Sequence, residues 1–196
     1  SAKTCDSPAK DDSKTEEIAL AKVRDSIKNE SGSEILSGNS LFAFEAKAKN
    51  KLVDFGDYLR IVTDKSVDEA FKEQAREMIK DLFISDSVKI NLSFSKELKD
   101  KKLTINELLR NGQALKDNSI EFIFDSIEIS EPLRKINEFS YRGSLKFSQS
   151  FMVFSSSDTL FGSSVGKNME IVAIKIRKPF GNDTMKIWRI FLGNIY

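Results

Sequence analysis

Residues 139–154, FSYRGSLKFSQSFMVF, decide the fold of this chain. Apolar and polar side chains alternate along most of the stretch, which is typical of a β-strand with one buried side. The apolar side consists of Phe139, Tyr141, Leu145, Phe147, Phe151 and Val153. Strands usually have about five or six residues. We therefore expect this longer one to curl, with Gly143 at the bend.

Two amphipathic helices are predicted before the strands. In residues 40–62, apolar side chains recur every three or four positions, which indicates one face of a long helix. This face comprises Leu41, Phe44, Ala48, Leu52, Phe55, Leu59 and Val62. Asn39 or Ser40 can cap the helix, and Gly56 within it predicts a close approach or a bend. A second helix is predicted over residues 67–83, with the apolar face Val67, Phe71, Ala75, Met78 and Leu82.

From residue 87 onwards, the apolar period changes from that of a helix to that of a strand. The predicted order is a strand at 87–94, a short helix at 103–112 capped by Thr104, a strand at 119–130, a turn at Pro132, the strand at 139–154, a loose connection at 155–166, and strands at 167–178 and 184–196. The fold class predicted from this order is α+β with an antiparallel sheet.

Over residues 40–196, this element order resembles the nuclear-transport-factor-2-like superfamily, a cystatin-like α+β cone. The Trp188-Arg189-Ile190 pattern in the closing strand is common in that superfamily. The resemblance implies a curved antiparallel sheet of about five strands, wrapped around the N-terminal helices and enclosing an apolar pocket. It also implies a homodimer through the outer sheet face. Because the superfamily contains enzymes and non-enzymes, it says little about function.

Residues 1–38 are predicted to be a polar, largely flexible leader with a short helix at 15–28, and residues 39–196 a single domain. Cys5 followed by a polar tether resembles the start of a mature bacterial lipoprotein, although Thr4 is not the small residue that normally precedes the cysteine. We therefore predict a cell-envelope or periplasmic location with a lipid anchor at Cys5. An incidental cysteine in a cytoplasmic protein is the alternative. No run of apolar residues is long enough to predict a membrane span.

The composition excludes several kinds of partner and site. With 31 basic and 30 acidic residues, the formal charge is only +1, so nucleic acid is not a predicted partner. The chain has no histidine and a single cysteine. It therefore lacks an imidazole base and the ligands of a Cys/His zinc site. No metal, cofactor or catalytic residue is predicted.

Four residues are predicted to contact a ligand on the concave side of the sheet: Asp125, Tyr141, Phe147 and Trp188. A carboxylate in an apolar pocket has a raised pKa and can act as a base, and a pocket tyrosine can donate to a developing oxyanion. Asp125 and Tyr141 therefore define one alternative, an isomerase or dehydratase. The alternative to this catalytic role is a structural one, in which Asp125 lies on the outer face of the sheet and Tyr141 is a core aromatic. We favour a non-catalytic binding or assembly module over the enzyme and over a cytosolic binder of an apolar ligand.

Overall fold

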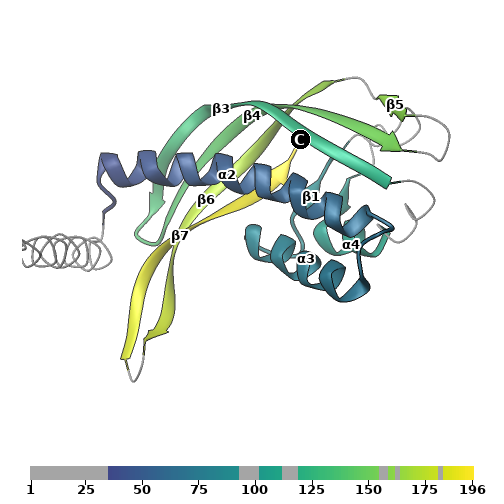
Figure 1. The fold of residues 1–196 in the computed structure, drawn as a ribbon. Helices are drawn as coiled ribbons and strands as arrows, with labels where there is room; N and C mark the ends of the chain where they lie inside the picture. Colours follow the sequence, from purple (N-terminus) through teal and green to yellow (C-terminus); the bar gives the residue numbers. More distant parts are fainter. Residues whose placement is uncertain (1–34, 93–101, 112–118, 155–158, 162–163, 181–182) are drawn as a thin grey trace, which may run out of the picture.

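The computed structural model describes residues 35–92, 102–111, 119–154, 159–161, 164–180 and 183–196. A long helix lies across the concave face of a curved antiparallel sheet, and two shorter helices lie beside one end of it (Figure 1). The sheet has the strand order β3-β4-β6-β7, with β5 paired to β4. The predicted α+β class and the curved sheet are confirmed. Cys5 and the predicted helix at 15–28 lie outside the described residues.

Helix α2 spans Gly38–Thr63, as its apolar spacing predicts. The cap is Ser37, whose Oγ accepts a hydrogen bond from the Ser40 backbone N at 3.1 Å. The helix therefore begins slightly earlier than expected. Gly56 does mark a close approach, because a Cβ there would lie 3.2 Å from the carbonyl oxygen of Phe122.

Helix α3 spans Glu69–Leu82, and its predicted apolar face is partly wrong. Phe71 is 65% exposed and Met78 is 41% exposed. The buried stripe is instead Ala75, Ile79 and Leu82, on the second half of the helix. The helix packs through this narrow stripe alone, so Phe71, near its first turn, lies beyond the contact.

The alternation of residues 87–94 is confirmed in burial, with Val88, Ile90 and Leu92 all buried. The regular strand is much shorter than predicted, however. Strand β1 covers only Lys89–Ile90 and pairs with β2, Leu103–Thr104, in a small sheet of its own. Phe94 lies outside the described residues.

Strand β3 spans Ser119–Asn137 and runs straight through Pro132, so the predicted turn at that proline is wrong. The turn to β4 lies at residues 138–139 instead. A proline is tolerated here for two reasons. Strand β3 is at the edge of the sheet, and its register against β4 shifts between Glu131 and Arg134. As a result, Phe139 is in the turn and 57% exposed, rather than on the buried side of β4.

Strand β4 spans Ser140–Phe154, and Gly143 marks a close approach of β3. A Cβ on Gly143 would lie 2.6 Å from the Glu131 carbonyl oxygen, a distance that real Cβ atoms essentially never show. At each register shift between β3 and β4, β3 advances by one residue more than β4, so the unpaired residues lie in β3. The pairing of β4 with β6 has no register shift. The absence of a side chain at Gly143 thus allows β3, with its irregular pairing, to approach β4 closely.

Strands β6, Val165–Phe180, and β7, Asp183–Ile195, form the predicted closing hairpin. The connection predicted at 155–166 contains β5, Thr159–Phe161, which pairs with the end of β4. Helix α4, Ile105–Asn111, has the predicted Thr104 cap. The Thr104 Oγ1 accepts from the Glu107 backbone N at 3.2 Å, and the Glu107 carboxylate accepts from the Thr104 N at 2.7 Å. This reciprocal arrangement is a capping box.

Candidate functional site

Side chains of α2 pack against the concave face of the sheet. The Phe55 ring stacks on Phe124 with centroids 5.8 Å apart, and Phe124 meets Phe147 edge to face at 5.5 Å. Phe55 is fully buried and Phe147 is 1% exposed. Phe147 is therefore a core residue that packs against Phe124.

Tyr141 and Trp188 also belong to this packed face, with ring centroids 5.3 Å apart. The Tyr141 hydroxyl accepts a hydrogen bond from the Leu36 backbone N at 3.1 Å, which ties the start of the described chain to the sheet. Trp188 Nε1 is buried and has no hydrogen-bond partner among the described residues. Tyr141 therefore has a structural task, as the core-aromatic interpretation expects.

Asp125 is exposed, beside Ser126 with φ of 51° at a register shift in β3. It pairs with Ser148 of β4, whereas Lys135 of β3 pairs with Tyr141. Since Ser148 and Tyr141 are seven residues apart on β4, Asp125 and Tyr141 are separated by roughly 23 Å along the strand. The structure does not bring these two groups together, so the isomerase or dehydratase alternative is not favoured.

Phe191, on the opposite side of β7 from Trp188, is covered within the chain itself. The Lys51 ammonium group lies 5.8 Å from the ring centroid, and the Arg189 guanidinium lies 4.8 Å from it. Burial, followed by repulsion from Arg189 and Lys47, lowers the pKa of Lys51 to about 8. The burial of Phe191 therefore needs no second copy of the chain.

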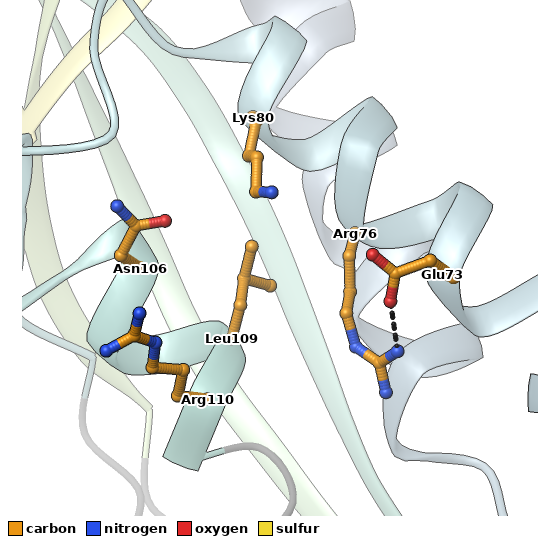
Figure 2. Close-up of a pocket in the computed structure, with 6 residues that line it drawn as sticks. All are labelled: Glu73, Arg76, Lys80, Asn106, Leu109 and Arg110. Atoms are coloured by element: carbon orange, nitrogen blue, oxygen red, sulfur yellow. Dashed lines mark hydrogen bonds and ion pairs between the residues drawn. The ribbon is translucent and has the colours of Figure 1, made fainter.

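Helices α3 and α4 face each other across a groove of about 270 Å³. Figure 2 shows the residues that line it on both helices, with Leu109 between the two. The groove is lined by Glu73, Arg76, Lys80, Asn106, Leu109 and Arg110. Leu109 is 5% exposed and belongs to the core, so the groove has an apolar base with polar walls.

The α3 wall carries two cations held by carboxylates. The Arg76 guanidinium bonds to Glu69 and to Glu73, at 2.7 Å each. Partial burial opposes the charge of Arg76, but these hydrogen bonds more than offset it and raise its pKa. Lys80 bonds to Glu77 at 2.6 Å, and that hydrogen bond raises the pKa of the lysine. Both groups are therefore fixed as cations at neutral pH.

The α4 wall carries Asn106 and Arg110, four residues apart and thus on one face of the helix. Arg110 is exposed, and no carboxylate in the described part of the chain forms an ion pair with it. Within the described residues its guanidinium is therefore not paired with a carboxylate, unlike the two cations of α3. A carboxylate or phosphate is the natural ligand of such a group.

Among the residues that the structure describes, none of the helices combines the length and apolar character needed to cross a membrane. The same residues contain no group of three or more acidic or cysteine side chains placed to hold a metal ion.

Comparison with known proteins finds similarity only at the level of fold. No family model matches the sequence, and no curated protein does. Among solved structures, a scytalone dehydratase-like protein from Novosphingobium aromaticivorans is similar at 7% identity with a TM-score of 0.38, over 81% of this chain and 90% of that chain. A Catenulispora acidiphila protein in complex with S-DNPA is similar at 10% identity with a TM-score of 0.34, over 63% of this chain and 83% of that one.

The protein Aln2 from a Streptomyces species is similar at 8% identity with a TM-score of 0.34, over 62% of this chain and 78% of that one. At these identities the likeness concerns the fold alone.

Proposed function

We propose that this chain is a non-catalytic binding protein that holds a small anionic compound in the groove between α3 and α4. The observation that carries the proposal is the exposed Arg110, which has no carboxylate partner among the described residues and lines a groove of about 270 Å³ together with Lys80 and Asn106. A guanidinium can bind a carboxylate through two parallel hydrogen bonds, and the amide of Asn106 can add a third.

A binding role fits the groove better than a catalytic one. Glu73 is the carboxylate among the lining residues, and it is bonded to Arg76. A carboxylate held by a guanidinium stays ionised and is a weak proton acceptor. The ligand is small, because the groove is near the lower end of the volumes that bind drug-sized molecules, about 300 Å³.

Calorimetric titration with succinate, a small dicarboxylate, and with inorganic phosphate tests the proposal. We expect wild type to bind at least one of these anions and Arg110→Gln to bind it about 10- to 100-fold more weakly, since hydrogen bonds between charged groups are worth about 1.5–3 kcal/mol. Arg142→Gln is the matched control, because Arg142 is an exposed arginine on β4 that does not line the groove. Equal affinity of Arg110→Gln and wild type, or no binding by wild type, would contradict the proposal.

The envelope location, the lipid anchor on Cys5 and the homodimer through the sheet are further parts of the proposal that rest on the sequence and the resemblance. For the anchor, labelled palmitate should enter the product of the natural gene and fail to enter a Cys5→Ser variant. For the dimer, sedimentation should give twice the monomer mass.

A further inference from the structure

The last part of the β6–β7 hairpin extends beyond the rest of the sheet. Pairing between β4 and β6 ends at Ser140 and Ile174, whereas β6 and β7 remain paired as far as Phe180 and Asp183. Figure 1 shows this two-stranded ribbon projecting from the same end of the molecule as the start of α2 and the β3–β4 turn. Two-stranded ribbons have little stability of their own, so this one is suited to contacts outside the fold.

The ribbon is strongly cationic. Arg177 lies directly opposite Lys186 in the register, and like charges at opposed positions destabilise a strand pair. Both side chains and that of Lys178 are exposed. None of the three forms an ion pair with a described carboxylate. An external anion at this position would relieve the repulsion between Arg177 and Lys186.

Exposed apolar side chains lie on segments at the same end of the molecule (Figure 1). Phe139 is 57% exposed, and its carbonyl oxygen accepts from the Lys175 N at 2.9 Å, which places it at the base of the ribbon. Ile136, next to it on β3, is 58% exposed. Near the start of α2, Ile35 is 64% exposed and Phe42 is 74% exposed. The bond between Leu36 N and the Tyr141 hydroxyl holds this segment against β4.

We name this surface the ribbon end. Its apolar members are Ile35, Phe42, Ile136 and Phe139, and its cations are Arg134, Lys135, Arg177, Lys178 and Lys186. The carboxylate of Glu138 is exposed on the β3–β4 turn, and that of Glu45 accepts from the Leu133 N at 2.8 Å. Cations therefore dominate the described side chains of the surface.

We propose that the ribbon end docks on a lipid surface that contains anionic headgroups. Exposed apolar side chains can enter the boundary between headgroups and acyl chains, and neighbouring Lys and Arg side chains can contact the lipid phosphates. Nucleic acid offers the phosphates but no place for Phe139 and Ile136, and the whole chain is nearly neutral with a formal charge of +1. Charge and apolar exposure together therefore favour a lipid surface.

Vesicle sedimentation of the full chain tests this proposal. We expect binding to vesicles of equal parts phosphatidylcholine and phosphatidylglycerol, little binding to phosphatidylcholine alone, and weaker binding as salt rises. Arg177→Gln with Lys186→Gln should weaken binding roughly 30-fold, because each cation near an anionic surface contributes about 1 kcal/mol. Phe139→Ser should weaken it as well. Circular dichroism should show that these exposed substitutions leave the fold intact.

The matched control is Lys89→Gln with Lys102→Gln, two exposed lysines outside the ribbon end that remove the same charge. This control should bind like wild type. If the control and the ribbon variant lost vesicle binding equally, binding would depend only on the overall charge of the chain, and the proposal would be overturned. Binding to polyglutamate or duplex DNA, with none to anionic vesicles, would assign the surface to an acidic protein or to nucleic acid instead.

Discussion

Lys51 is a buried lysine whose charged form is destabilised by its surroundings. Its side chain covers the Phe191 ring, and the residue is only 9% exposed. Burial and the nearby Arg189 and Lys47 make its charged form unfavourable, and this lowers its pKa from 10.5 to about 8. In return, the ammonium group lies over the face of an aromatic ring, which attracts a cation.

This shift predicts a rise in stability with pH. Between a pKa of about 8 in the folded state and 10.5 in the unfolded state, the unfolded chain binds more protons at Lys51. The free energy of unfolding therefore increases as pH rises through that interval, and below it the penalty for the buried charge is fully present. Urea unfolding at about pH 7 and about pH 10 measures the change.

Lys51→Met is the control, because it keeps the stem and removes the charge. Other groups titrate in the same interval, among them Tyr58, whose pKa burial raises. Their contribution is shared by wild type and variant and cancels in the comparison. Wild type should gain stability relative to Lys51→Met as pH rises, and an unchanged difference would show that Lys51 is not buried as a cation.

At the scale of elements, helix α4 depends on its capping box to present Asn106 and Arg110 to the groove. Thr104→Ala removes the side-chain acceptor for the Glu107 N, and loss of such a cap costs about 1 kcal/mol. We expect lower stability in urea and weaker binding of succinate or phosphate than in wild type. Thr104→Ser should restore both, since serine keeps the hydroxyl. Full binding by Thr104→Ala would mean that the cap does not position the α4 wall.

Most elements could be predicted from the sequence, because the spacing of apolar residues and the positions of capping and turn residues are local properties. The regular spacing from Leu41 to Val62 predicts α2, and the alternation around Leu145 and Phe147 predicts β4. The turn was misplaced at Pro132, because the sequence does not show that β3 is an edge strand, where proline is tolerated. The exposure of Phe71 likewise depends on where α3 meets its neighbours.

The candidate groove could be predicted less well than the fold. The capped helix at 103–112 was predicted, and the spacing of Asn106 and Arg110 was the available signal for a polar face. From the sequence, the charged face of α3 is indistinguishable from that of any solvent-exposed helix. What brings Arg76 and Lys80 opposite Arg110 is tertiary packing of two helices whose buried sides include Ile79 and Leu109. That juxtaposition has no local sequence signature.

Across the whole molecule, the curved sheet and α2 form a packed body with different surfaces at its two ends. The groove between α3 and α4 lies at one end, and the ribbon end lies at the other (Figure 1). At the centre, Phe55 contacts Phe83 and Phe124, at 5.0 and 5.8 Å between ring centroids. The proposed ligand site in the groove lies outside this packed centre.

Amide chemical-shift mapping during titration with succinate and, separately, inorganic phosphate tests this claim most directly. At least one titration should move the resonances of Arg76, Lys80, Asn106 and Arg110, while those of Phe147 and Trp188 stay in place. Saturable shifts centred on Tyr141, Phe147 and Trp188, with the α3 and α4 resonances unmoved, would place the ligand in the concave face and contradict the account.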